Sequence, residues 1–357
     1  MKTLCLALLL AASAAHALTA EESQTLRQAA ITAGKQGDDA TAFAHWQTLA
    51  EAGDAEAQLT LGLLYYQGDG TAQDSAQARE WLGKAAAQNN TTAQYMLGVL
   101  YQRGEGGVQD HAKARAWLEK AAAQGSPEAQ YRLGLIYESG IGVTPDDAQA
   151  AAWWEKAAAQ GYANAQYNLG VLYDEGKGVT HDYTQAAAWY EKAAVQGDAD
   201  AQFNLGLLYD EGKGVTQDYT QAAAWYEKAA VQGLVQAQYN LGVLYRDRQG
   251  VAQDYGQART WFEKAAAQNF APAQFNLGVL YRDGQGVAQD YGKARAWFEK
   301  AAAQKGNKEA QQIAQQALQE LDIADGQKPW HPDPAAQERE RIREVIQRLV
   351  EGKGGTP

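Results

Sequence analysis

The sequence contains one cysteine, Cys5, and seven prolines in 357 residues. Cys5 lies in a leader segment that we expect to be removed, so the remaining chain must be stable without disulfides. Beyond this leader, no stretch approaches the about 18 consecutive apolar residues of a membrane-spanning helix. Basic residues are also few, because 31 Lys and Arg against 43 Asp and Glu give a net charge of −12. This charge disfavours nucleic acid and anionic membrane surfaces as partners.

Long β-branched runs are absent as well, whereas alanine, glutamine and glycine are abundant. This composition argues against a β-sandwich or a doubly wound sheet and favours helices. Hydrophobic residues make up 46% of the chain, including 10 tryptophans and 19 tyrosines, which is enough to bury a core.

The leader comprises residues 1–17. Lys2 precedes an apolar run from Leu4 to Ala15, and Ala15 and Ala17 are the small residues expected at a cleavage site. This arrangement is typical of a secretory signal peptide cleaved after Ala17. We therefore expect the mature protein in the periplasm or outside the cell.

A Leu-Gly pair recurs every 36 residues, and a fixed period of this length indicates a repeat array. Its leucines are Leu61, Leu97, Leu133, Leu169, Leu205, Leu241 and Leu277. Tryptophan keeps the same period at Trp81, Trp117, Trp153, Trp189, Trp225, Trp261 and Trp297. Seven repeats without insertion are expected over residues 54–306.

Each repeat is expected to form two helices, which we call the A helix and the B helix. In residues 201–233, one face of the A helix is formed by Ala201, Leu205, Leu208 and Tyr209. Gly206 lies beside this face, where we expect a second backbone to approach closely.

Glycines end the A helix at Gly212–Val215, and Asp218 is the expected N-cap of the B helix. One face of the B helix carries Ala222, Trp225, Tyr226 and Ala229. A single hairpin of this size has too little core to fold alone, so the repeats must stack on one another.

These residues resemble the Sel-like repeats (SEL-one-like repeats), which are relatives of the tetratricopeptide repeats. The shared pattern is A-x-A-Q-Y-x-L-G-x-x-Y-x-x-G-x-G-V-x-x-D-x-x-x-A-x-x-W-Y-x-K-A-A-x-x-G, and it is matched through most of residues 55–306. The resemblance implies an all-α fold, a right-handed α/α superhelical solenoid whose concave face is lined by A helices and serves as a scaffold for proteins or peptides. A cysteine-rich secreted branch of the family, linked to β-lactam binding or hydrolysis, carries a disulfide in each repeat, and this chain lacks those cysteines.

The segments outside the repeats are expected to cap or extend the array. Residues 18–53 predict an N-terminal capping hairpin, and residues 307–325 predict a C-terminal capping helix. Residues 326–334 are a Pro-rich linker, and residues 335–357 predict an amphipathic helix with a flexible tail. We expect that helix either to dock on the solenoid or to pair with a partner or a second copy of the chain.

One loop departs from the repeat pattern, because Arg248 stands where the other six repeats have glycine after the A helix. The loop must either change shape or hold Arg248 at positive φ, at a cost of about 1–2 kcal/mol.

The residues that catalysis or metal binding would need are scattered. The five histidines share neither a repeat position nor an i, i+4 pair, so we expect no metal site and no cofactor. No serine lies in a G-x-S-x-G or S-x-x-K motif, which argues against serine catalysis. The G-x-G loops follow helices rather than strands, so we interpret them as structural connections.

The A-helix surface that remains after the core is assigned is the candidate binding surface. Directly before the repeated leucine, four successive repeats carry asparagine: Asn168, Asn204, Asn240 and Asn276. Such amides can hydrogen-bond the backbone of an extended peptide. Five residues after the leucine, acidic residues give way to basic ones, which predicts an acidic and a basic half: Asp174, Asp210, Arg246 and Arg282. Recent duplication that copied asparagine without a function explains the row equally well.

We therefore predict a non-enzymatic, protein- or peptide-binding scaffold of the bacterial cell envelope that holds its ligand on the concave face. Two alternatives stay open. One is a β-lactam-binding or hydrolysing, cell-wall-active enzyme, as proposed for the cysteine-rich relatives. The other is a binder of peptidoglycan glycopeptide, and it rests on aromatic residues bordering the same face: Tyr131, Tyr167, Phe203, Tyr239 and Phe275.

Overall fold

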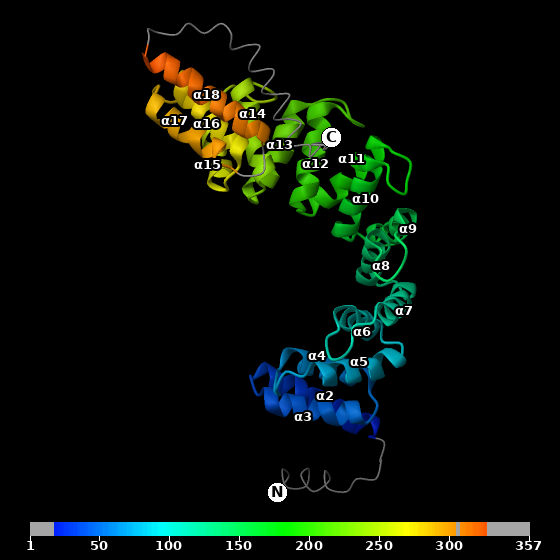
Figure 1. The fold of residues 1–357 in the computed structure, drawn as a ribbon. Helices are drawn as coiled ribbons and strands as arrows, with labels where there is room; N and C mark the ends of the chain where they lie inside the picture. Colours follow the sequence, from blue (N-terminus) through cyan, green and yellow to red (C-terminus); the bar gives the residue numbers. More distant parts are fainter. Residues whose placement is uncertain (1–17, 305–307, 327–357) are drawn as a thin grey trace. The chain divides into compact units, whose positions relative to one another are not determined.

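The structure, a computed structural model, describes residues 18–304 and 308–326, and all regular secondary structure in these ranges is helical (Figure 1). Helices α2 (Ala20–Lys35) and α3 (Asp39–Glu51) form a first hairpin. The A helices that follow are α4 (Ala55–Gln67), α6 (Thr91–Arg103), α8 (Pro127–Ser139), α10 (Ala163–Glu175), α12 (Ala199–Glu211), α14 (Val235–Asp247) and α16 (Ala271–Asp283). The B helices are α5 (Ser75–Ala87), α7 (His111–Ala123), α9 (Asp147–Ala159), α11 (Tyr183–Val195), α13 (Tyr219–Val231), α15 (Tyr255–Ala267) and α17 (Tyr291–Ala302). The prediction of an all-α solenoid of seven helix pairs is confirmed.

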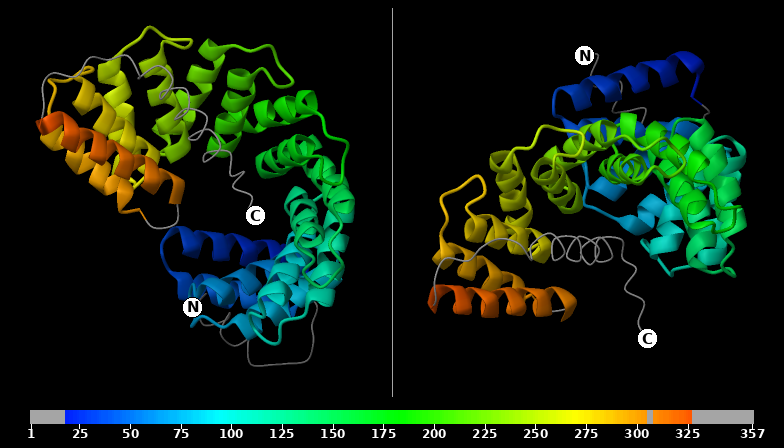
Figure 2. Two further views of the ribbon diagram at one scale, coloured as in Figure 1. Left: turned by 45° about the horizontal axis from the view of Figure 1, so that its top comes forward. Right: turned by 90° about the horizontal axis from the view of Figure 1, so that it is seen from above.

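Two compact units divide the described residues. The first ends at Ala165 and also includes Lys177–Val179, and the second begins at Gln166 and includes the rest. Within each unit, consecutive helices pack side by side, and α18 (Lys308–Gly326) packs on α17 in the second (Figure 2). All the asparagine, aspartate and arginine residues of the predicted binding surface belong to the second unit.

Three predicted segments lie outside the described residues. They are the signal peptide at residues 1–17, the linker beyond Gly326 and the amphipathic helix with its tail at residues 335–357. The hairpin of α2 and α3 occupies most of residues 18–53, and α18 begins within residues 307–325.

The helix ends follow from local residues. The carboxylate of Asp218 accepts hydrogen bonds from the backbone N–H groups of Thr220 (2.9 Å) and Gln221 (3.1 Å), which caps α13 as expected. Gly212 ends α12 in the left-handed region, with φ of 69°. Arg248 takes the same role after α14 with φ of 60° and ψ of 43°, so this loop keeps its shape and places a non-glycine residue at positive φ.

Two glycines of each repeat allow close packing. A Cβ on Gly206 would lie 2.7 Å from the ring of Tyr226 on α13, so this glycine receives an aromatic ring rather than the second backbone that we expected. A Cβ on Gly214, in the following loop, would lie 2.2 Å from the backbone of Tyr183. The second glycine therefore lets the loop of one repeat rest on the start of the B helix of the preceding repeat.

Six tryptophans of the period pack against a buried cluster formed by the preceding B helix and their own A helix: Trp81, Trp117, Trp153, Trp225, Trp261 and Trp297. Trp225, for example, contacts the buried cluster that contains Tyr190 and Leu205. The ammonium group of Lys228 lies 3.6 Å from the centroid of the Trp225 ring, and every repeat has an equivalent Lys–Trp pair. Each lysine thus covers the exposed part of its indole and adds a cation–π contact.

Candidate functional site

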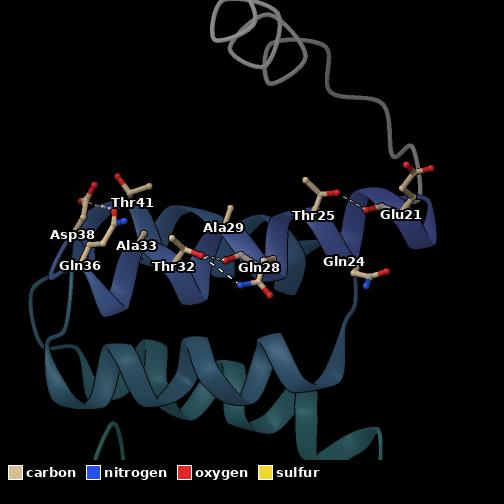
Figure 3. Close-up of a pocket in the computed structure, with 10 residues that line it drawn as sticks. All are labelled: Glu21, Gln24, Thr25, Gln28, Ala29, Thr32, Ala33, Gln36, Asp38 and Thr41. Carbon is tan, nitrogen blue, oxygen red and sulfur yellow. Dashed lines mark hydrogen bonds between the residues drawn. The ribbon is translucent and has the colours of Figure 1, made fainter.

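A cavity of about 610 Å³ lies on the outer side of the first hairpin, along α2 and the start of α3 (Figure 3). Its lining is polar, and the hydroxyls of Thr25 and Thr32 donate to the carbonyls of Glu21 (2.8 Å) and Gln28 (2.7 Å) in their own helix. A polar outer face is what a terminal hairpin needs to end a repeat array in water. The capping role of this hairpin stays a prediction, and its polar face is in keeping with it.

The candidate binding surface is a line of exposed side chains on the A helices of the second unit. On α12, Asp200, Asn204, Leu207 and Glu211 follow at i, i+4, i+7 and i+11 and stay partly or fully exposed. The equivalent residues of α14 are also partly or fully exposed, as are those of α10 from Asn168 onward, which belong to the second unit. We call this set the A-helix stripe, and it consists of Asn168, Val171, Glu175, Asp200, Asn204, Leu207, Glu211, Gln236, Asn240, Val243 and Asp247.

Two asparagines of the stripe, Asn204 and Asn240, contact tyrosines of the core. The amide of Asn204 donates to the hydroxyl oxygens of Tyr167 and Tyr190, and the Tyr190 hydroxyl donates to Oδ2 of Asp174 over 3.2 Å. A chain of hydrogen bonds thus runs from Asn204 to a carboxylate, which fixes the orientation of the amide.

The next repeat has the same chain of hydrogen bonds. The amide of Asn240 donates to the hydroxyl oxygen of Tyr226, which donates to Oδ2 of Asp210 over 3.1 Å. Asn204 and Asn240 are therefore both half-exposed and both oriented by the same set of partners one repeat apart. Asp174 and Asp210, which the sequence indicated as part of the binding surface, accept the hydrogen bonds of the tyrosine hydroxyls.

Burial and negative charge shape the titration of these groups. Burial, together with the charges of Asp200 and Asp198, raises the pKa of Tyr167 to about 12. Burial also raises the pKa of the Asp174 carboxyl, and the hydrogen bond from Tyr190 opposes this shift. The pKa of Asp200, which stays exposed, is raised by partial desolvation of its carboxylate and by the neighbouring charge of Asp198.

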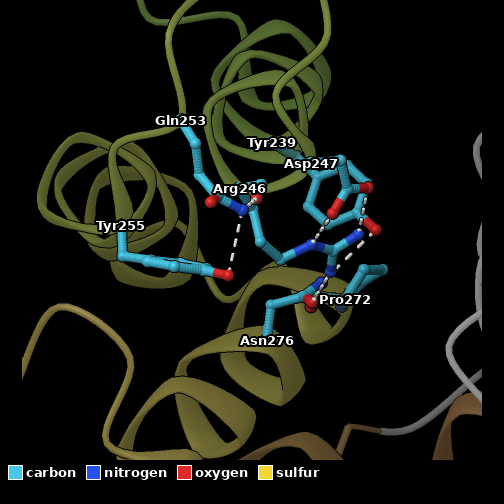
Figure 4. A network of polar contacts seen from close by, with 7 residues as sticks. All are labelled: Tyr239, Arg246, Asp247, Gln253, Tyr255, Pro272 and Asn276. Carbon is cyan, nitrogen blue, oxygen red and sulfur yellow. Dashed lines mark hydrogen bonds and ion pairs between the residues drawn. The ribbon is translucent and has the colours of Figure 1, made fainter. Parts of the chain in front are cut away.

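The last asparagine of the row has a different environment (Figure 4). Asn276 is 1% exposed, its Oδ1 accepts from the Arg246 guanidinium, and its Nδ2 donates to the carbonyl oxygen of Pro272 (3.0 Å) and to the Tyr239 hydroxyl (3.4 Å). Both ends of this amide are used inside the protein. Asn276 is therefore a structural residue and not the accessible ligand contact that its repeat position indicated.

The two arginines of the predicted basic half are neutralised within their own helices. Arg246 forms a bidentate contact with Asp247, at 2.6 Å and 2.8 Å, and Nε of Arg282 lies 2.8 Å from Oδ1 of Asp283. Burial lowers the pKa of Arg246, but the contact with Asp247 outweighs it, and the net shift is upward. This end of the stripe consequently lacks the excess positive charge that the sequence indicated.

The aromatic residues considered for a glycopeptide are packed against the protein. Phe203, Tyr239 and Phe275 are buried, and their rings contact Tyr226, Phe262 and Phe298 of the B helices. The rings of Tyr131 and Tyr167 likewise contact Trp154 and Tyr190. Three of the five residues are thus part of the core, whereas Tyr131 and Tyr167 stay partly exposed, and the sugar-stacking surface stays a prediction.

A row of buried glutamines was not recognised in the sequence. Gln202 donates through Nε2 to the carbonyl oxygen of Ala194 (3.0 Å), and its Oε1 accepts from Nε2 of Gln232 (2.9 Å). The buried members of the row are Gln58, Gln94, Gln130, Gln166, Gln202, Gln238 and Gln274. The signal was present, because Ala-Gln recurs with the 36-residue period, but a buried polar side chain cannot be told from an exposed one without its partners.

Within the described residues, no group of three or more His, Cys, Asp and Glu side chains is placed to hold a metal ion. None of the helices in this part of the chain is sufficiently long and apolar to cross a membrane.

The repeats match a family of known proteins. A family model for the Sel1 repeat matches residues 55–90, 91–126, 127–162, 163–198, 199–234, 235–270 and 271–305. Comparison with curated proteins gives no match.

Two solved structures are similar over most of the chain. The crystal structure of c5321, a protective antigen present in uropathogenic Escherichia coli strains displaying an SLR fold, is 37% identical with a TM-score of 0.74 and covers 88% of this chain. A Sel1 repeat protein from Oxalobacter formigenes is 36% identical with a TM-score of 0.64, and the match covers 83% of this chain and 87% of that one. This chain spans 64% of the length of c5321.

Proposed function

Because the chain belongs to the Sel1 repeat family, whose repeats mediate protein interaction, we propose that it is a non-enzymatic scaffold that binds an extended polypeptide along the A-helix stripe. The observation that carries this proposal is the pair Asn204 and Asn240, half-exposed at equal positions and oriented by tyrosines. Oriented amides at repeat spacing provide hydrogen bonds to a main chain without reorganisation on binding.

The aliphatic part of the stripe supports the same ligand class. Val171, Leu207 and Val243 lie three residues after the asparagines and are only partly buried. A polypeptide in extended conformation presents amides and side chains in alternation, so it fits neighbouring rows of amide and aliphatic groups.

We further propose that the protein acts in the periplasm or outside the cell. The support is the leader at residues 1–17, with its basic start, apolar run and small residues at the cleavage site. The description of c5321 as a protective antigen is in keeping with a position outside the cytoplasm.

The test uses a phage-displayed library of random dodecapeptides selected on the full chain. The double variant Asn204→Ala/Asn240→Ala is expected to bind the selected peptides about tenfold more weakly, since two hydrogen bonds are lost at about 0.5–1.5 kcal/mol each. The matched control is Gln185→Ala/Gln221→Ala, which removes two exposed amides at repeat spacing from α11 and α13. Equal binding by the asparagine variant and the control would show that the stripe is not the binding surface.

A further inference from the structure

The hydrogen-bond direction around Asn204 determines what the stripe offers a ligand. The amide nitrogen donates to the Tyr167 and Tyr190 hydroxyls, and the Tyr190 hydroxyl itself donates a hydrogen bond to Asp174. The group of Asn204 without a partner among the described residues is therefore its carbonyl oxygen, which is an acceptor. Asn240 is held in the same way through Tyr226.

In the following repeat, the equivalent side-chain oxygen of Asn276 is already occupied by a hydrogen bond within the protein. There Arg246 replaces the aspartate, and its guanidinium donates to Oδ1 of Asn276. The Asp-to-Arg change thus decides whether the asparagine oxygen is available. The available acceptors of the row end at Asn240, on α14.

A second acceptor lies one helical turn before each available asparagine. Asp200 precedes Asn204, is exposed, and has no hydrogen bond or ion pair within the part of the chain that the structure describes. Gln236 precedes Asn240, and its side-chain oxygen is buried without any hydrogen-bond partner among the described residues. A buried acceptor without a donor is unfavourable, and because Gln236 is partly exposed, its side chain can turn outward to a ligand that brings a donor and so relieve this cost.

Charge distinguishes the two acceptor pairs. On α12, Asp200 is a carboxylate close to Asp198, and this like charge contributes to its raised pKa. On α14, Gln236 is neutral, and the neighbouring charges of Arg246 and Asp247 compensate each other. The stripe therefore changes from an acidic acceptor pair on α12 to a neutral one on α14.

We propose that the ligand of the A-helix stripe is a basic extended polypeptide, with a lysine or arginine paired to Asp200 over α12 and an uncharged donor-bearing portion over α14. This inference rests on the proposed function and adds the charge of the ligand and the helix over which its charged part lies. A cationic side chain supplies several N–H donors and no acceptor, which complements a surface whose available groups are acceptors.

The experiment repeats the dodecapeptide selection on the full chain and on Asp200→Asn, and sequences the enriched peptides. We expect the unaltered chain to enrich lysine and arginine over aspartate and glutamate, and Asp200→Asn to lose this preference. Individual basic peptides should bind Asp200→Asn about two- to five-fold more weakly, which is the size of an exposed ion pair. Glu191→Gln removes the same charge from the exposed side of α11 and should leave their binding unchanged.

Two results separate this inference from the proposed function. Enriched peptides without a basic preference that still depend on Asn204 and Asn240 would overturn the inference and leave the proposed function standing. Peptides that bind the asparagine double variant as well as the unaltered chain would overturn both. Basic peptides that bind Asp200→Asn and Glu191→Gln equally well would also overturn the pairing with Asp200.

Discussion

The glycine of each Leu-Gly pair shows how a single residue sets the distance between two helices. Gly62 of α4 faces Leu82 of α5, and a Cβ at this position would lie 2.7 Å from Cγ of Leu82 and 3.2 Å from its backbone nitrogen. The same position faces an aromatic ring in later repeats, such as Phe262 opposite Gly242. Glycine thus occurs at this position in every repeat because a large side chain of the B helix packs directly against the backbone of the A helix.

Gly62→Ala is expected to lower the free energy of unfolding by about 1–3 kcal/mol, because the added methyl overpacks this contact. Gly83→Ala in the adjacent α5 is the matched control, since a Cβ there meets no atom within 4 Å. The control should raise stability by up to about 1 kcal/mol through helix propensity. Urea denaturation followed by circular dichroism measures both, and equal effects of the two substitutions would contradict the packing at Gly62.

At the scale of elements, one glutamine joins three helices. The side chain of Gln202 on α12 bonds the carbonyl of Ala194 at the end of α11, and it accepts from Gln232 at the end of α13. Gln232 also donates to the carbonyl of Gly197 (3.0 Å), so the connection between α11 and α12 is tied to α13. Within each unit, the glutamine row therefore links neighbouring repeats at the ends of the B helices.

Gln202→Ala should lower the free energy of unfolding by about 1–3 kcal/mol, because buried polar partners lose a hydrogen bond. Gln221→Ala, at an exposed position of α13, removes an amide of the same size and should change stability by less than about 0.5 kcal/mol. The comparison is made by chemical denaturation of the full chain. A loss at Gln202 no larger than that at Gln221 would be incompatible with the inter-repeat role.

The elements themselves were predictable because their signals are local. Asp218, Gly212 and the apolar period determine where helices begin and end. For Arg248 the sequence allows either a changed loop or a positive φ, and the structure has the positive φ. The partners of the candidate site were not predictable in this way. The side-chain oxygen of Asn276 is occupied by a hydrogen bond from Arg246, which lies 30 residues earlier in the sequence. The charge of Arg246 is in turn compensated by the adjacent Asp247, and the orientation of that side chain depends on the fold.

At the scale of the whole chain, the repeats of the second unit meet their neighbours through largely equivalent contacts. Consequently, removal of residues 199–234 would place Val235 directly after Asp198. Asp198, which caps α12 through the N–H of Ala201 (2.8 Å), would then cap α14, whose own N-cap residue Leu234 makes no side-chain bond. Asn240 would take the place of Asn204 beside Tyr190, since the two asparagines have equivalent tyrosine partners.

This deletion is expected to keep the mean helix content per residue and a cooperative unfolding transition, with reduced stability because one inter-repeat interface is lost. The control deletes residues 199–216, which removes α12 and its loop but keeps α13. That control brings two B helices together without the intervening A helix, so Tyr226 loses the glycine surface of Gly206 that receives its ring. It should unfold without cooperativity or aggregate. Circular dichroism measures the helix content of both variants, and urea denaturation measures the cooperativity of their unfolding. A whole-repeat deletion that behaves like the half-repeat deletion would contradict the equivalence of the repeats.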